Sequence, residues 1–231
     1  MGMMNSRALE DLFKIADEKR MIAKYDFKLS AIEIYNEQVR DLLEPNDASG
    51  KQKKLDVKTD PATGASTVPD MLHSPCASTN DVDRLMDLAT KNRTSASTTM
   101  NQHSSRSHLI LTVHITRIDL VNGGTLFGKL HLIDLAGSER LSRTGAEGDR
   151  LTEAKNINKS LSALGNCISA LVTKSKHVPY RDSKLTFLLQ DSLGMDSKTL
   201  MFVCASPAEA DVTGDEHPII SVPRVVTGLR I

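Results

Sequence analysis

The sequence predicts an α/β fold in which a central mixed β-sheet carries helices on both faces. Residues 25–35 read as a strand with apolar side chains on both of its faces, which is typical of a strand in the middle of a sheet that helices flank. Residues 108–120 and 126–135 read as two further strands, and the intervening Asn122-Gly123-Gly124 is a strong hairpin signal. Residues 156–171 repeat apolar side chains at helical spacing, which predicts a long helix.

The N-terminal part of the chain is expected to open with a helix. Asn5 or Ser6 can cap this helix, its apolar residues share one face, and the charged residues 17–20 close it. After the strand 25–35, residues 37–43 are expected to form a short helical turn, because Pro45 prevents a longer helix.

Two more elements are expected before residue 100. Residues 55–68 have Thr63-Gly64 at their middle, which suggests a small hairpin outside the main sheet. Thr79 is then expected to cap a helix that runs through Lys91. The serine- and threonine-rich run 94–99 that follows cannot hold a helix well.

The C-terminal part is expected to hold a capped helix and a buried strand. Ser183 can cap a helix over residues 184–193, which Gly194 ends. Residues 198–205 read as a buried strand. The sequence shows no internal repeat, low-complexity tract or heptad run, so it is expected to fold as one unit.

Bulk composition excludes several classes of protein. The 231 residues are enough to bury a sizeable core. Twenty-nine basic and 29 acidic residues give zero net charge, so no overall basic field argues for a nucleic-acid partner. Three cysteines lie far apart without metal-ligand spacing, which indicates a reducing, cytosolic compartment. No apolar run approaches the length of a membrane span, so no membrane partner is expected.

Two polar loops carry the predicted chemistry, and both are expected on the same side of the sheet. Residues 101–108 read Asn-Gln-His-Ser-Ser-Arg-Ser-His, and residues 134–139 read Asp-Leu-Ala-Gly-Ser-Glu. The first loop offers adjacent hydroxyls and a guanidinium. The second offers a carboxylate directly after a strand, then a glycine whose N–H can approach an anion closely. A hydroxyl and an aspartate suit a nucleotide-bound Mg²⁺, so the two loops together are predicted to sense a phosphate.

These two loops resemble switch I and switch II of the kinesin motor domain, in the same order and at similar spacing. Further matches to kinesins are Glu33-Ile34-Tyr35-Asn36-Glu37, the helix 156–171, which kinesins lay against tubulin, and residues 177–186. Within kinesins, residues 194–201 and 128–131 are similar to the kinesin-14 class. The resemblance covers about residues 7–207, so a partial motor domain is expected over 1–207 and a divergent C-terminal tail over 208–231.

The resemblance implies a Mg·ATP site. Ser105 would contact the Mg²⁺ and the terminal phosphate, with Ser104 beside it. Asp134 would hold the metal through water, and the Gly137 N–H would sense the γ-phosphate. Asn101 would complete the nucleotide-contacting set.

The resemblance also implies a salt bridge between Arg106 and Glu139 that closes when the phosphate is present. An arginine–carboxylate pair that links two mobile loops makes a two-state latch. The alternative is that both residues are ordinary surface charges.

Microtubules are the implied partner, and basic residues along the long helix and the loop after it would bind their acidic surface. The residues expected to do so are Lys155, Lys159, Lys174, Lys176, Arg181 and Lys184. The alternative is that the charges only form a solvated face. By resemblance the protein would act in the cytoplasm on the microtubule cytoskeleton, and any dimerisation is expected through segments outside these residues.

The sequence departs from the family at both ends. It contains no Gly-x-x-x-x-Gly-Lys-Ser/Thr, so a truncated motor domain is expected, without the segment that carries the P-loop and the first three strands. Two of those strands would neighbour residues 198–205, and an exposed apolar edge is therefore expected there. At the other end, Pro218, Pro223 and Gly228 make the family's closing helix unfavourable.

Three functions are considered for this sequence. The first is an ATP-driven microtubule motor, with very weak ATP affinity expected for this chain alone because the P-loop positions the β- and γ-phosphates. The second is a non-enzymatic microtubule-binding remnant. The third, a GTPase-like switch protein, is disfavoured because the sequence contains no Asn-Lys-x-Asp.

Overall fold

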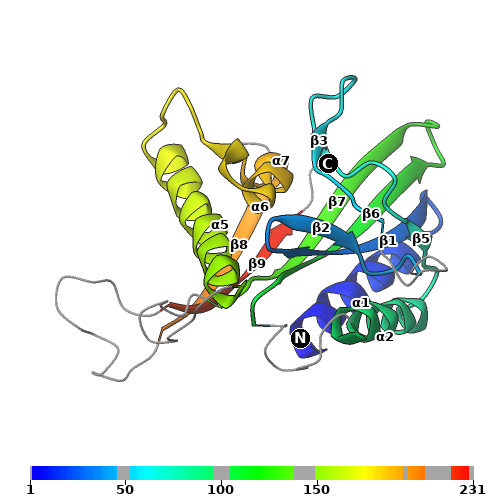
Figure 1. The fold of residues 1–231 in the computed structure, drawn as a ribbon. Coiled ribbons are helices and arrows are strands. Elements are labelled where there is room, and N and C mark those ends of the chain that lie inside the picture. Colours follow the sequence, from blue (N-terminus) through cyan, green and yellow to red (C-terminus); the bar gives the residue numbers. More distant parts are fainter. Residues whose placement is uncertain are drawn as a thin grey trace.

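A seven-stranded sheet runs through the centre of the molecule (Figure 1). The computed structural model describes residues 2–45, 53–95, 105–137, 149–194, 197–205 and 220–228. Within these ranges every strand pair of the sheet is antiparallel. The strands along the sheet are, in spatial order, β2 (Gln38–Asp41), β1 (Ala23–Tyr35), β6 (His108–Asp119), β7 (Thr125–Asp134), β9 (Ile220–Gly228) and β8 (Lys198–Ala205), while β5 (Ser74–Pro75) pairs with β1.

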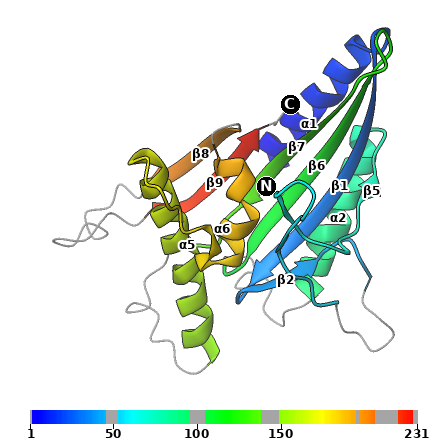
Figure 2. The same ribbon diagram turned by 90° about the horizontal axis from the view of Figure 1, so that it is seen from above.

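The register of the three long strands brings the two polar loops together. β1 pairs with β6 from Ala23↔Asp119 to Ile34↔His108. β6 pairs with β7 through the hairpin predicted at residues 122–124, and Leu109 lies opposite Asp134. The start of β6 and the end of β7 therefore lie at one edge of the sheet, at the far end from the hairpin turn (Figure 2).

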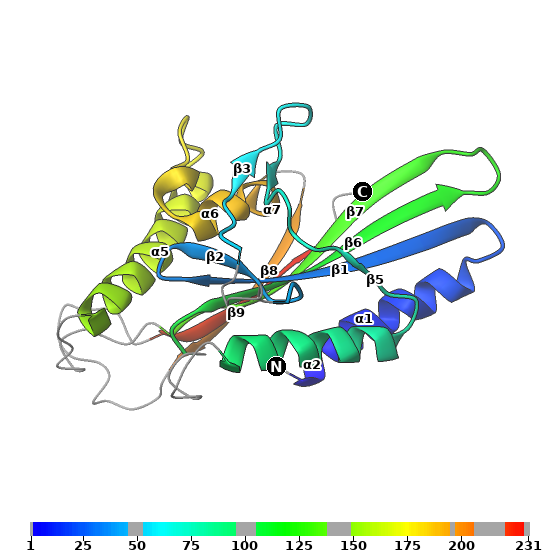
Figure 3. The same cartoon turned by 45° about the vertical axis from the view of Figure 1, so that its right-hand side comes forward.

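Helices cover both faces of the sheet, as the sequence predicted (Figure 3). On one face, α1 (Gly2–Glu18) and α2 (Thr79–Ser95) pack against alternate residues of β1 and β6 such as Leu29 and Leu111. On the other face lie α5 (Asp149–Val172), η1 (Tyr180–Asp182), α6 (Lys184–Leu188) and α7 (Gln190–Leu193). A second core forms there around Ile34, Ile110 and Leu185. None of the helices in the described ranges combines the length and apolarity that a bilayer crossing requires.

The predicted small hairpin is confirmed as a separate two-stranded sheet of β3 (Lys58–Thr59) and β4 (Ser66–Thr67). Its turn contains Gly64 with a positive φ of 71°, a conformation that glycine adopts without strain. Ser66 fixes this hairpin to the rest of the molecule, because its N–H donates to the Asp191 carboxylate at 2.8 Å and its hydroxyl donates to the Leu188 carbonyl at 2.8 Å.

The prediction of a helical turn over 37–43 is wrong. Asn36 and Glu37 have positive φ values of 51° and 59°, so they form a two-residue turn that sends the chain back antiparallel to β1. Residues 38–41 consequently form β2. The tight bend that follows is stabilised by the Asp41 carboxylate, which accepts the Leu43 N–H at 2.8 Å.

Helix ends differ from the sequence-based expectations in three places. The α1 helix begins at Gly2 rather than at residue 5 or 6. The cap of α2 is Ser78 rather than Thr79, because the Asp81 N–H donates to the Ser78 hydroxyl at 3.2 Å, and α2 continues to Ser95. Ser183 does cap its helix, through a capping box with Thr186.

The helix expected over residues 184–193 is two short helices. The first, α6, ends at its C-cap Leu189, and the second, α7, begins from the same residue. Both stay attached to the sheet because Leu185, Leu188 and Leu189 are buried in the second core.

The C-terminal segment completes the sheet between β7 and β8. β9 pairs with β7 from His131↔Thr227 to Asp134↔Arg224 and with β8 along most of its length. The β8–β9 register shifts between Phe202 and Cys204, where Val222 and Pro223 lie against a single residue of β8. A proline donates no ladder hydrogen bond, so a bulge is the place where a strand tolerates one.

The prediction that residues 198–205 are a buried strand is wrong for part of β8. Leu200 is 56% exposed, and Met201 and Phe202 are 36% and 37% exposed. These residues point to alternate faces, so the strand is open to solvent on both. β8 is the last strand of the described sheet, and the exposed apolar edge expected there is therefore present.

Candidate functional site

The two predicted loops touch each other at the shared edge of β6 and β7. The backbone N–H of Gly137 donates to the carbonyl oxygen of Ser105 at 2.7 Å. The Ser105 side chain is exposed, and the Asp134 side chain, at the end of β7, is one-quarter exposed. The hydroxyl and the carboxylate predicted to act together thus belong to segments joined by a hydrogen bond.

A buried arginine organises this edge of the sheet. Arg93, near the end of α2, lies 3.4 Å from the Glu33 carboxylate of β1 and 3.9 Å from the Asp134 carboxylate. Its guanidinium also donates to the Ser107 carbonyl and hydroxyl at 3.0 Å. Glu33 is fully buried and the Arg93 side chain is 9% exposed, so each charge helps to compensate the other in a site with little water. The arginine therefore fixes Asp134 relative to the first loop.

Sequence reasoning missed Arg93 as a functional residue. The only local signal was a basic side chain in the last turn of a helix, which usually just complements the helix dipole. Glu33 was noted as part of a motif without a role. Their pairing depends on the packing of α2 against β1, which sequence pattern does not specify.

His108 connects the second loop to the long helix. The Ala136 N–H donates to its Nδ1 at 3.0 Å, so Nε2 carries the proton and donates to the Ser160 hydroxyl of α5 at 2.8 Å. Burial, with the nearby Arg93 charge, lowers the pKa of His108 to about 4. The ring is therefore neutral at pH 7 and holds one tautomer. Sequence reasoning named this histidine as the last residue of the first loop motif and assigned it no role.

Arg106 pairs with a residue that the sequence did not suggest. Its guanidinium lies 2.9 Å from the Glu153 carboxylate, which is buried on α5. The predicted partner Glu139 lies outside the described residues, and so do Asn101 and Ser104. Glu153 also affects Tyr35, whose pKa is raised by burial and by a hydrogen bond to this carboxylate. Arg106 thus links the first loop to α5.

The oxygen donors at the loops fit a nucleotide-bound Mg²⁺. Mg²⁺ is usually held by one or two carboxylates together with substrate phosphates and water, and Ser105 and Asp134 supply one hydroxyl and one carboxylate. Within the described ranges no group of three His, Cys, Asp or Glu side chains could enclose a metal. The donor set therefore suits an ion that arrives with a phosphate rather than an ion held by protein alone.

The six predicted microtubule-binding residues lie on α5, on the loop after it and near the start of α6, but three of them have intramolecular partners. Lys184 lies 2.5 Å from Asp56, and this ammonium lowers the pKa of the aspartate. The Arg181 guanidinium lies 4.7 Å from the centre of the Phe187 ring. Lys159 lies 4.0 Å from Glu37. Of the remaining three, Lys155, Lys174 and Lys176, all are exposed.

The turn between β1 and β2 joins the two helices that carry these basic residues. The Glu37 carboxylate accepts the backbone N–H of Lys184 at 3.2 Å, at the start of α6. The Asn156 side chain of α5 donates to the Asn36 side chain. Since Glu33 lies on the same strand, β1 connects the arginine network to both helices.

Comparison with known proteins gives a consistent result. The sequence model described as "Kinesin motor domain" matches residues 1–216. The kinesin-like protein KIN-14G of Arabidopsis thaliana is 51% identical over 212 residues, which make up 92% of this chain and 21% of that protein. KIN-14F of Oryza sativa subsp. japonica is 53% identical over 212 residues, with the same coverage. The chain therefore spans about a fifth of the length of these relatives.

Solved structures give the same match. The motor domain of the kinesin-like protein Kar3 of Saccharomyces cerevisiae has a TM-score of 0.71 at 36% identity, over 84% of this chain and 58% of that one. A structure described as a fast kinesin has a TM-score of 0.71 at 42% identity, over 82% of this chain and 52% of the other.

Proposed function

The chain belongs to the kinesin motor-domain family, and from this premise we propose that it is the phosphate-sensing and microtubule-facing part of a kinesin-14-type motor. The observation that carries the proposal is the position of His108. Its ring joins the backbone of the second loop, at Ala136, to Ser160 of α5. A movement of the second loop would therefore be transmitted through the His108 ring to α5, the helix that would face the microtubule.

At the phosphate end, Ser105 and Asp134 would hold the Mg²⁺ of a bound ATP, with Asn101 and Ser104 as further nucleotide contacts. The ion would neutralise charge on the phosphate oxygens. The Gly137 N–H already has a strong acceptor in the Ser105 carbonyl. Its donation to a terminal phosphate requires that bond to open, which makes the loop contact the element that responds to phosphate.

At the other end, the exposed lysines Lys155, Lys174 and Lys176 would bind the acidic microtubule surface. Lys159, Arg181 and Lys184 belong to the same surface, and their intramolecular partners hold it in shape. Arg106 and Glu153 form a second link between the first loop and α5. A latch between Arg106 and Glu139 would compete with this pair, because one guanidinium would serve two carboxylates.

The proposed organisation is a partial motor domain over 1–207 followed by a divergent tail over 208–231. The tail would then contribute to the domain through β9, which pairs into the same sheet. We place the protein in the cytoplasm on microtubules, with dimerisation left to segments beyond these residues.

A second candidate function is microtubule binding without ATP turnover. It is favoured by the exposed lysines of α5 and of the loop after it, whose charges need no nucleotide to bind an acidic surface. Microtubule pelleting separates the two functions. Release that depends on a non-hydrolysable ATP analogue or ADP supports the motor, and binding that ignores nucleotide supports the second function.

The decisive experiment measures microtubule-stimulated phosphate release by the purified chain. Stimulated turnover that Asp134→Ala abolishes supports a motor whose chemistry uses this site. For the microtubule surface, Lys176→Glu is expected to weaken pelleting at least tenfold, and the matched charge reversal Lys14→Glu on the opposite face is expected to leave it unchanged. Equal effects of both reversals would contradict the assigned surface.

A further inference from the structure

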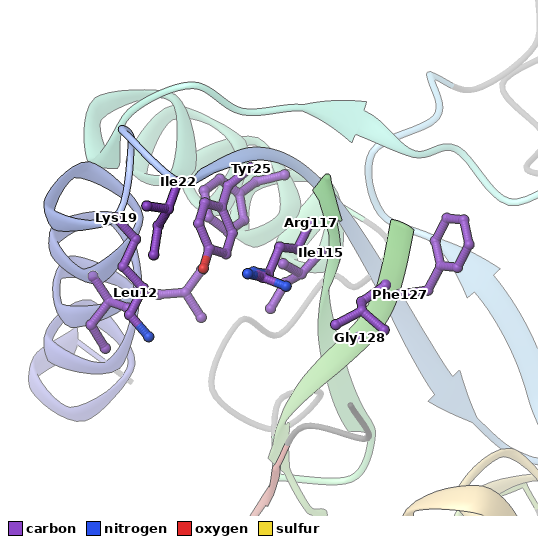
Figure 4. A pocket seen from close by; sticks show the side chains of 11 residues that line it. Leu12, Lys19, Ile22, Tyr25, Ile115, Arg117, Phe127 and Gly128 are labelled. Carbon is purple, nitrogen blue, oxygen red and sulfur yellow. The ribbon is translucent and has the colours of Figure 1, made fainter. Parts of the chain in front are cut away.

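An apolar cleft lies between α1 and the outer half of the long strands, at the opposite end of β6 from the phosphate loops (Figure 4). It holds about 410 Å³ and is lined from α1 by Leu12 and Ile15, from the following turn by Ile22, and from the sheet by Phe27, Ile115 and Leu126. This volume is within the range of small-molecule sites, roughly 300–1,000 Å³. No step of the proposed motor function uses this part of the molecule.

The shape of the cleft follows from the strand register. Gly128 of β7 lies directly opposite Ile115 of β6, and because it has no side chain the space over that pair stays open. The neighbouring pair is Arg117 with Leu126. Ile15, Ile22 and Leu126 at the margin are 48%, 49% and 42% exposed, so the cleft can be entered from solvent.

Both charged residues that line the cleft are cationic. They are Lys19, in the turn directly after α1, and Arg117 of β6, and Figure 4 shows the Arg117 side chain reaching from the strand toward α1. One nitrogen of Arg117 also lies 3.0 Å from Asp119 at the hairpin turn, which leaves the rest of the guanidinium fork for another acceptor. An apolar space with two cations and a tyrosine, Tyr25, at its wall is complementary to an anion with an apolar body.

We propose that this cleft binds a single-chain amphipathic anion, such as a medium-chain carboxylate. The acyl chain would lie over Ile115 and Gly128, and the carboxylate would lie between Lys19 and Arg117. A peptide helix or a second copy of the chain would also be apolar, but neither requires both charged lining groups to be cationic.

Calorimetric titration of the protein with hexanoate, octanoate and decanoate tests whether the acyl chain of the ligand enters the cleft. Each pair of added methylenes that enters the cleft should tighten binding about fifteenfold. At equal chain length, the alcohol should bind at least tenfold more weakly than the carboxylate, and the trimethylammonium compound should not bind. Equal affinity for the three head groups would overturn the proposal.

Variants locate the site. Gly128→Val should abolish binding by filling the cleft, and it suits a strand position because β-branched residues are favoured there. Leu126→Glu should weaken carboxylate binding at least tenfold. Val121 lies outside the cleft at the hairpin turn and is 83% exposed, so the control Val121→Glu should leave binding unchanged. Unchanged thermal unfolding shows that the variants fold. Binding that survives both cleft variants, or a concentration-dependent dimer that only the cleft variants abolish, would refute a small-anion site.

Discussion

The backbone N–H of Gly137 donates to the carbonyl oxygen of Ser105 at 2.7 Å, so the two loops predicted to sense phosphate are bonded to each other. One loop precedes β6 and the other follows β7, and the hairpin register brings their ends together. The glycine N–H that would donate to a phosphate is satisfied by protein here. The loops can therefore change partners without leaving a buried donor unpaired.

Removal of the Arg93 guanidinium should destabilise the fold by about 3–5 kcal/mol, because it breaks a buried ion pair with the Glu33 carboxylate 3.4 Å away. Urea unfolding of Arg93→Ala measures this loss. Arg84→Ala is the control on the same helix, since Arg84 is 75% exposed in its pair with Asp81; its cost should be below about 1 kcal/mol. Similar losses of unfolding free energy in both variants would contradict the organising role assigned to Arg93.

Stability should fall as the pH drops from about 6.5 toward 4. The folded pKa of His108 is lowered to about 4, so the unfolded chain binds a proton in this window that the folded chain does not, and stability rises with pH there. Between pH 7 and 5, His108 should account for a loss of about 2 kcal/mol.

Urea unfolding at the two pH values measures this effect. His108→Gln should lose about 2 kcal/mol less than the parent over that interval. Burial also lowers the pKa of His114 to about 3 and that of His131 to about 4. These two residues therefore still contribute to the pH dependence of stability in the His108→Gln variant. An identical slope in His108→Gln would show that the ring is not buried neutral.

A double-mutant cycle distinguishes the partners of Arg106. The pair with Glu153 has side chains only 24% and 11% exposed, so Arg106→Ala and Glu153→Ala should couple by about 1 kcal/mol or more in the absence of nucleotide. The same cycle with Glu139→Ala should give little coupling in that state and more when a nucleotide is bound. Strong coupling to Glu139 without nucleotide would show the latch to be permanently closed.

Loss of the α6 cap should cost about 1 kcal/mol. The Ser183 hydroxyl accepts the Thr186 N–H at 3.1 Å and is buried, so Ser183→Ala leaves that N–H without its acceptor. Thermal unfolding compares it with Ser175→Ala in the exposed loop before it. A neutral Ser183→Ala would mean that packing of Leu185 and Leu188 alone holds α6.

A proline in β9 should loosen the strands on both sides. Val225 pairs with Ile133 of β7 and with Met201 of β8, so Val225→Pro removes a ladder donor. Hydrogen exchange is expected to rise in residues 131–134 and 198–202, and to stay unchanged in β1. Unchanged protection in β7 and β8 would show that β9 does not hold them together.

The sequence predicted the elements whose signals are local. The Asn122-Gly123-Gly124 turn and the alternation on either side of it specify the β6–β7 hairpin, and apolar spacing specifies α5. The turn at Asn36-Glu37 was misread because glutamate rarely adopts a positive φ, and a short polar stretch before a proline resembles a helix end. Tertiary contacts with α5 and α6 hold that turn in place.

The site was only partly predictable for the same reason. Ser105, Asp134 and Gly137 lie in motifs that can be read from the chain. Arg93 and Glu153 come from helices distant in sequence, and their roles arise only when those helices pack on the sheet. β9 was also not foreseen, because prolines argue against a central strand and a bulge that tolerates one is visible only in the paired structure.

That bulge has a consequence for how the chain avoids mispairing. If β9 slid by one residue along β7 and β8, Pro223 would move into a ladder position that needs a donor, and every side chain of the strand would change face. Both effects penalise the shifted alignment, so the proline excludes the neighbouring registers. β9 can thus pair correctly with β7 in one register only, in which Arg224 lies opposite Asp134.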